Sequence, residues 1–153
     1  LIGYYAAFQS AGFGFEYSAV SEAAIVITPW VLFLIQFFWQ FPHFWAIAWV
    51  ADDDYKNAGF RLLPTTKKDS ISAWMIFLSA MIMIPAGFLP WYYGFGGMIF
   101  TIASLIGGLC FTYFGFQHMR YKTDSTARKV MFTSFLYLPL TQLVLLFDFI
   151  PFK

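Results

Sequence analysis

Three consecutive carboxylates, Asp52, Asp53 and Asp54, stand immediately after a long apolar segment of the sequence. Adjacent carboxylates repel one another, so a cation close to them would stabilise the group. Oxygen ligands of this kind suit Mg²⁺, which proteins commonly hold with one or two carboxylates together with the phosphates of a substrate. The triplet therefore predicts a magnesium site. The alternative interpretation is a solvated loop whose acids balance its bases.

Four basic residues follow the acidic triplet in the same polar stretch: Lys56, Arg61, Lys67 and Lys68. Carboxylates can bind a metal ion while ammonium and guanidinium groups bind phosphate oxygens, so the combination is typical of a metal–diphosphate site. In such a site the bases would stabilise the negative charge that develops on a departing diphosphate. The loop is therefore predicted to bind diphosphate.

The apolar segment before the triplet carries polar side chains at helical spacing. Gln36, Gln40 and His43 fall within about 60° of arc on a helix, and Asp54, 18 residues after Gln36, continues the same line. Polar groups in a membrane helix are costly and usually face a cavity or a partner. Pro42 removes one backbone hydrogen bond and predicts a kink beside His43. The stripe indicates a cavity leading to the acids, with hydrogen bonding to a neighbouring helix as the alternative.

These residues stand in a chain of 153 residues that is 60% hydrophobic and only 11% charged, against roughly 25% charged residues in an ordinary soluble domain. Such a composition excludes a disordered chain. A single cysteine, Cys110, excludes a disulfide scaffold. The formal net charge of +1 leaves no basic surface for nucleic acid. The chain is therefore predicted to be a polytopic membrane protein embedded in a lipid bilayer.

Four apolar segments are each long enough to cross about 30 Å of hydrocarbon as a helix. Because lipid offers the backbone no hydrogen-bond partners, we expect an all-α bundle forming a single domain over residues 1–153. The spans are predicted at about residues 23–49, 71–93, 96–117 and 127–149, with loops at about 50–70 and 118–126. The apolar start at Leu1 resembles the end of an earlier helix, so we expect a carboxyl-terminal portion of a longer protein.

The basic residues predict the orientation of these spans. Eight of the nine Lys and Arg residues lie in or beside the two loops, which the number of spans places on one side of the membrane. The positive-inside rule makes that side cytoplasmic. We therefore expect a multi-pass protein of the cell (inner) membrane with the acidic loop, residues 50–70, facing the cytoplasm.

Aromatic side chains make up 24% of the sequence. Trp39, Phe41, Phe44 and Trp45 are predicted to lie inside the first span, where an aromatic wall suits a flat apolar ring or a polyprenyl tail. Aromatic faces also stabilise an allylic cation. Most of the other aromatic residues are expected to face lipid.

His118 ends the third span, at a predicted depth similar to that of His43. Two histidines at one depth can ligate a haem iron. A non-catalytic membrane anchor that holds haem is therefore an alternative function, although a histidine at this position is more often simply interfacial.

The string Trp-Gln-Phe-Pro-His-Phe-Trp at residues 39–45, followed by Asp53-Asp54-Tyr55, resembles the protoheme IX farnesyltransferase (haem O synthase) group of the UbiA-type intramembrane prenyltransferases. Similarity continues at Ala127-Arg128-Lys129 and Leu138-Pro139, and so covers essentially the whole chain. The resemblance implies the carboxyl-terminal half of a nine-helix fold: four full transmembrane helices and the end of a fifth.

The same resemblance implies a reaction and its participants. Farnesyl diphosphate would donate its farnesyl group to a vinyl group of haem B with the help of Mg²⁺. Asp53 and Asp54 match the second acidic motif of the family and would be catalytic and metal-binding, with Asp52 a further metal ligand where the family commonly has a basic residue. The residues expected to bind substrate are Trp39, Gln40, His43, Phe44 and Tyr55.

The first acidic motif of the family, of the type Asn-Asp-x-x-x-Asp, does not occur in this sequence. Because the metal–diphosphate cage needs two acidic loops, the chain alone is expected to be inactive. Its missing amino-terminal half would then be a required partner. Another UbiA-type polyprenyltransferase is the remaining alternative for the function.

Overall fold

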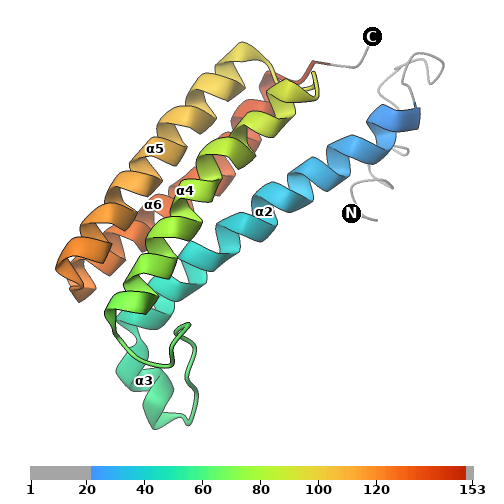
Figure 1. Ribbon diagram of the computed structural model, residues 1–153. Helices are drawn as coiled ribbons and strands as arrows, with labels where there is room; N and C mark the ends of the chain where they lie inside the picture. Colours follow the sequence, from blue (N-terminus) through green and yellow to red (C-terminus); the bar gives the residue numbers. More distant parts are fainter. Residues whose placement is uncertain (1–21, 151–153) are drawn as a thin grey trace.

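The structure, a computed structural model, describes the backbone of residues 22–150 and the side chains of residues 27–150. Within these limits the chain forms four long helices and one short one (Figure 1): α2 (Glu22–Val50), α3 (Asp52–Asn57), α4 (Ser70–Tyr92), α5 (Met98–Tyr121) and α6 (Asp124–Phe147). The predicted all-α fold is confirmed. The predicted end of an earlier helix at Leu1 lies outside the described residues.

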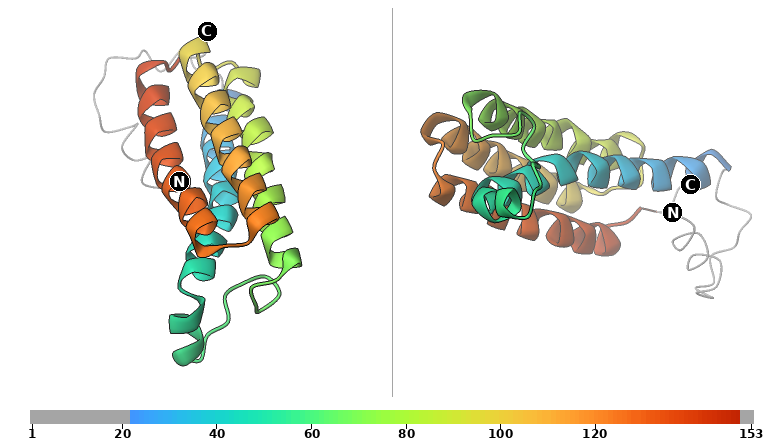
Figure 2. Two further views of the ribbon diagram at one scale, coloured as in Figure 1. Left: turned by 90° about the vertical axis from the view of Figure 1, so that its left-hand side faces the viewer. Right: turned by 90° about the horizontal axis from the view of Figure 1, so that it is seen from below.

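The four long helices alternate in direction and form a closed bundle. Each packs against two others, in the order α2, α4, α5, α6 and back to α2. Figure 2 shows that α3 and the loop after it project beyond one end of this bundle. We refer to that end as the acid end. The connection between α4 and α5 lies at the opposite end.

All four long helices have the length and apolar composition needed to cross a membrane, so the protein is a multi-pass membrane protein. Compared with the predicted spans, α5 starts two residues later and ends four residues later, and α6 starts three residues earlier and ends two residues earlier. α5 continues to Tyr121, and Lys122 then adopts a left-handed conformation with φ of 52° that ends the helix. Thr123 begins α6 with a capping box to Thr126. The loop predicted at 118–126 is therefore a tight turn around Lys122 and Thr123.

At the end opposite the acids, which we refer to as the closed end, the Asp148 carboxylate links α6 to the start of α5. Gly97, the N-cap residue of α5, has no side chain to cap the helix. Asp148 supplies the missing acceptor, because one of its carboxylate oxygens accepts from the backbone N–H of Phe100 at 2.7 Å. Its backbone carbonyl accepts from the N–H of Gly97 at 3.0 Å. The start of α5 and the end of α6 are thereby joined.

Small residues allow the helices to approach one another closely in the middle of the bundle. Ala46, Ala73 and Ala80 are fully buried. A Cβ atom at Gly87 of α4 would lie 2.0 Å from the hydroxyl oxygen of Ser104 on α5, so a larger residue there would force the Ser104 side chain to move. Membrane helices commonly pack through small residues in this way, since lipid provides no hydrophobic drive for their association.

Candidate functional site

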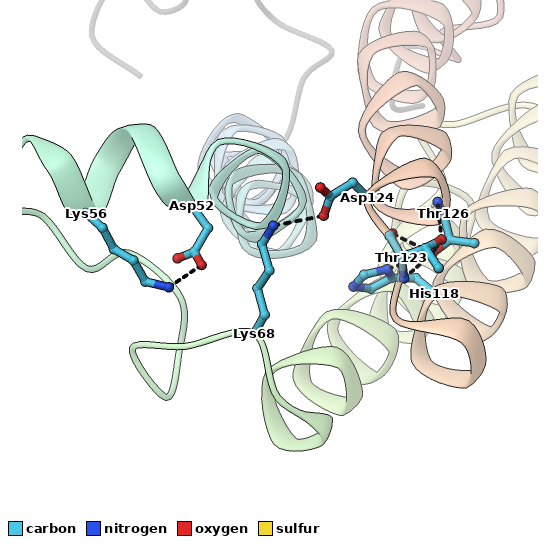
Figure 3. Close-up of polar contacts among 7 residues, drawn as sticks. All are labelled: Asp52, Lys56, Lys68, His118, Thr123, Asp124 and Thr126. Carbon is cyan, nitrogen blue, oxygen red and sulfur yellow. Dashed lines mark hydrogen bonds and ion pairs between the residues drawn. The ribbon is translucent and has the colours of Figure 1, made fainter.

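The acidic triplet forms the first turn of the short helix α3. α2 ends at Val50 and α3 begins at Asp52, so the triplet does not simply continue the long helix. Asp52 is only 5% exposed, and its carboxylate pairs with the Lys56 ammonium at 2.6 Å, one helical turn further on (Figure 3). This pair neutralises the carboxylate that is nearest to the bundle.

Asp53 and Asp54, in contrast, are exposed. Neither carboxylate takes part in an ion pair among the described residues. Within that same part of the chain, no three acidic, histidine or cysteine side chains come close enough to hold a metal ion. Two unpaired carboxylates fit the usual protein contribution to a Mg²⁺ site, in which water and substrate phosphates complete the coordination.

The four predicted diphosphate-binding bases differ in their surroundings. Lys56 is paired with Asp52, and Lys68 pairs with Asp124 of α6 at 2.9 Å. Arg61 and Lys67 are exposed and form no ion pair within the described part of the chain. In this arrangement Arg61 and Lys67 have their cationic groups available, while the two others would first have to leave their partners.

Contacts with the α5–α6 turn hold the end of the acidic loop in place. Lys68 reaches Asp124, as Figure 3 shows, and Lys122 donates to the hydroxyl of Ser70 at 2.8 Å. The partners are more than 50 residues apart in the sequence. Sequence reasoning missed Asp124 and Lys122 as parts of this region, because no periodic pattern relates them to the loop.

Asp69 fixes the point where the loop enters the membrane. Its carboxylate caps α4 by accepting from the backbone N–H of Ser72 at 2.7 Å. This backbone hydrogen bond, aided by hydroxyl groups of Thr65 and Ser72 and by the charge of Lys67, lowers the pKa of the Asp69 carboxyl below its ordinary value.

His43 is buried between α2 and α6, with 5% of its surface exposed. Its Nδ1 lies 2.7 Å from the hydroxyl oxygen of Ser134, and the Trp39 ring stacks on the imidazole at 4.3 Å. Trp39 also donates from Nε1 to the Ser134 carbonyl at 2.9 Å. The Ser134 hydroxyl donates to the carbonyl of Met131, so it accepts from His43. Nδ1 therefore carries the proton, and the helix–helix bond considered as an alternative is present.

Of the other residues predicted to bind substrate, Phe44 also contacts His43, with ring centroids 5.2 Å apart, as Trp39 does. Phe44 is exposed, Gln40 is half-buried, and Tyr55 is half-buried on α3. A hollow among the described residues lies elsewhere, between α2, α5 and α6 in the half of the bundle away from the acids. It is lined by Leu32, Ile35, Phe100, Ser104, Tyr137, Thr141, Gln142 and Leu145.

His118 does not share the depth of His43. Its Nδ1 lies 3.1 Å from the Thr126 hydroxyl, whereas His43 contacts Ser134. Thr126 and Ser134 are eight residues apart on α6, which is about 12 Å along the helix axis. One iron atom held by both imidazoles requires the rings to face each other across it. This spacing does not suit a haem anchor built from these two histidines.

Comparison of the sequence with known families gives one match over most of the chain. Residues 1–138 match the model of the UbiA prenyltransferase family. This chain belongs to that family. The match includes α2, the acidic helix and most of α6, and so covers every predicted site residue.

Comparison with individual proteins gives more detail than the family match. The protoheme IX farnesyltransferase of Cytophaga hutchinsonii is 42% identical over 121 residues, which cover 78% of this chain and 42% of the relative. Those of Christiangramia forsetii and Brucella suis are 41% and 35% identical, over 84% and 88% of this chain and 44% of each relative. The chain thus spans about two fifths of the length of these relatives. No solved structure matches it.

Proposed function

We propose that this protein transfers a farnesyl group from farnesyl diphosphate to a vinyl group of haem B, producing haem O. The observation that carries the proposal is the 35–42% identity to protoheme IX farnesyltransferases over more than three quarters of the chain. The family match over residues 1–138 contains both α2, which carries His43, and the acidic helix α3. The proposed setting is the cell (inner) membrane, with the acid end on the cytoplasmic side because the basic residues gather there.

In this proposal Asp53 and Asp54 hold Mg²⁺ together with the diphosphate of the substrate. Their exposure and their freedom from ion pairs within the described residues support this role. The metal ion supplies charge that stabilises the departing diphosphate. Asp52 joins the metal site when its pair with Lys56 opens, which also frees the Lys56 ammonium for a phosphate oxygen.

Arg61 and Lys67 bind the diphosphate oxygens directly and orient the leaving group. Lys68 can also bind a diphosphate oxygen when its ion pair with Asp124 opens. Cations placed where negative charge develops lower the barrier to ionisation of the allylic diphosphate. Tyr55, on α3 beside the carboxylates, is proposed to contact the same substrate.

His43 orients haem B on the α2 side of the site. Because Nδ1 donates to Ser134, Nε2 is left as the acceptor, and a histidine that binds iron commonly donates its other ring N–H to such a partner. Trp39, Gln40 and Phe44 are proposed to contact the macrocycle or the farnesyl chain. The aromatic rings of Trp39 and Phe44 would keep water scarce and stabilise the allylic cation.

The second acidic loop of the cage is proposed to come from residues beyond this chain. The chain spans about two fifths of its relatives, and among the side chains that the structure describes only the carboxylates of Asp53 and Asp54 take part in neither an ion pair nor a hydrogen bond. We therefore expect that the chain expressed by itself forms no haem O, and that adding the amino-terminal half of the same enzyme restores the reaction.

The test is an Asp54→Asn substitution in the full-length protein. We expect haem O formation to fall by at least about 100-fold, because a lost charge ligand weakens the stabilisation of the leaving group, while haem binding stays intact. Asp124→Asn is the matched control, since it removes an exposed carboxylate at the same end and should keep most of the activity. Wild-type turnover in Asp54→Asn would remove this carboxylate from the metal site. Prenylation of a different acceptor by the unmodified enzyme would favour another branch of the family.

A further inference from the structure

Two buried polar atoms lie just inside the acid end of the bundle. Trp49 is in the last turn of α2 and His118 is in the last turn of α5, and they are 1% and 0% exposed. Their rings meet edge to face with centroids 4.4 Å apart. Neither Trp49 Nε1 nor His118 Nε2 has a hydrogen-bond partner among the described residues. Buried polar groups nearly always have one, so this pair points to a ligand.

The hydrogen bonds around His118 show what kind of ligand fits. The Thr126 hydroxyl donates to the carbonyl of Thr123 at 2.8 Å, because a carbonyl can only accept. A hydroxyl has one hydrogen, so towards His118 Nδ1 the Thr126 oxygen accepts, and Nδ1 carries the proton. His118 forms no ion pair within the described residues, and a buried charge without a partner is strongly disfavoured. The ring is therefore neutral, and Nε2 is an acceptor.

Trp49 Nε1, in contrast, can only donate. The ligand must accept one hydrogen bond from Trp49 and donate one to His118. A hydroxyl oxygen does both, and water is the smallest molecule that carries one. Water molecules buried in proteins commonly satisfy polar groups that would otherwise lack partners.

We propose that Trp49 and His118 hold one water molecule, which joins the end of α2 to the end of α5. These helices lie at opposite corners of the bundle, since each packs on α4 and α6. Trp49 is three residues before Asp52, the first residue of α3. The bridge therefore fixes the root of the acidic helix and positions the carboxylates that follow. That positioning role rests on the function proposed above, whereas the water site itself does not.

Contacts on the other side of His118 support a positioning role. Thr126 belongs to the capping box of α6, and Asp124 in the same turn holds Lys68 of the acidic loop. Figure 3 shows His118 beside this turn, below the pair formed by Lys68 and Asp124. The imidazole thus lies between the two connections that reach the acid end, α2–α3 on one side and α5–α6 on the other.

The experiment is nuclear magnetic resonance on the full-length protein in perdeuterated detergent, with ¹⁵N-labelled tryptophan. The Trp49 indole signal is assigned by its loss in Trp49→Phe. We expect cross-relaxation from its N–H proton to a long-lived water molecule. Absence of a water signal, or a signal to a hydroxyl proton of the protein or of a lipid in its place, would overturn the proposal. This measurement needs no variant at His118 and so does not depend on how such a variant folds.

Two substitutions of His118 test the roles of its two ring nitrogens separately. His118→Asn keeps a polar group where Nδ1 meets Thr126 but has nothing at the position of Nε2, whereas His118→Gln places an amide oxygen near that position. We expect the water signal of Trp49 to disappear in His118→Asn and to persist in His118→Gln. An unchanged signal in His118→Asn would show that Nε2 does not hold the ligand.

The positioning role has its own readout in the enzymatic assay. We expect His118→Asn to raise the KM for farnesyl diphosphate by about 10-fold, an effect typical of residues that orient metal-binding groups, with kcat nearly unchanged and His118→Gln close to wild type. A KM unchanged in His118→Asn would overturn the positioning role. An unmodified enzyme that forms no haem O would contradict the proposed function while the resonance result still decides the water site.

Discussion

Asp148 at the closed end and the pair Asp53 and Asp54 at the acid end are used in opposite ways. At the closed end, Asp148 is committed to the backbone of α5, and Gly96 and Phe149 pair beside it. At the acid end, Asp53 and Asp54 project from a short helix beyond the bundle. A carboxylate that satisfies backbone N–H groups stabilises the fold, whereas one left exposed and unpaired among the described residues is available to a ligand. The contrast separates a structural acid from candidate functional acids without reference to sequence motifs.

The largest effect on stability is expected from Asp148→Ala. The substitution removes a charged acceptor from the N-terminus of α5 and leaves the N–H of Phe100 without it. Hydrogen bonds to charged groups contribute about 1.5–3 kcal/mol, so the free energy of unfolding should fall by about that amount. Unfolding of the protein by denaturant in detergent measures the change. A loss below about 0.5 kcal/mol would mean that the closed end does not depend on this carboxylate.

A smaller effect on the free energy of unfolding is expected from protonation of Asp69 at the acid end. The folded state lowers the pKa of Asp69, so its cap stabilises the protein above the pKa of the unfolded chain. That contribution is lost as the pH falls through the lower pKa of the folded state. Unfolding measured from neutral to strongly acidic pH should show this decline, and Asp69→Asn should make it shallower. Parallel pH profiles for the two proteins would contradict the assignment of the cap.

The smallest effect is expected from the ion pair between Lys68 and Asp124. Both side chains are partly solvated, and such pairs contribute between about 0 and 1 kcal/mol. A double-mutant cycle with Lys68→Met and Asp124→Asn measures the coupling, which should shrink further in high salt. A coupling comparable to the loss from Asp148→Ala would show that the acid end is held as firmly as the closed end, and the contrast between them would fail.

The sequence was sufficient to predict the helices and the end to which the acids belong. Four long apolar segments can only be helices in lipid, and the structure describes four such helices. The contacts between distant residues could not be predicted in this way. The partners Lys68 and Asp124 are 56 residues apart, and Phe100 and Asp148 are 48 apart. Hydropathy and periodicity report the local environment of a residue, and they carry no signal for a pairing at such separations.

The stripe through Gln36, Gln40 and His43 shows that prediction from helical periodicity is also limited at short range. Helical periodicity groups the three residues on one face of α2, but the structure buries only His43, while Gln40 is half-buried and Gln36 is exposed. The same periodicity also extends the line to Asp54, but the structure interrupts the helix between Val50 and Asp52. Ala51, the N-cap residue of α3, makes no side-chain capping bond. The sequence around it therefore carries no start signal that could have indicated the break.

The tight turn at Lys122 and Thr123 constrains how the molecule can move. A connection this short ties α5 and α6 into a hairpin, so neither helix can slide lengthwise past the other. The 12-residue stretch from Ala58 to Asp69, between α3 and α4, is longer, but the pair of Lys68 with Asp124 ties its end to the same hairpin. The acidic loop is thereby anchored to a hairpin whose two helices keep their register.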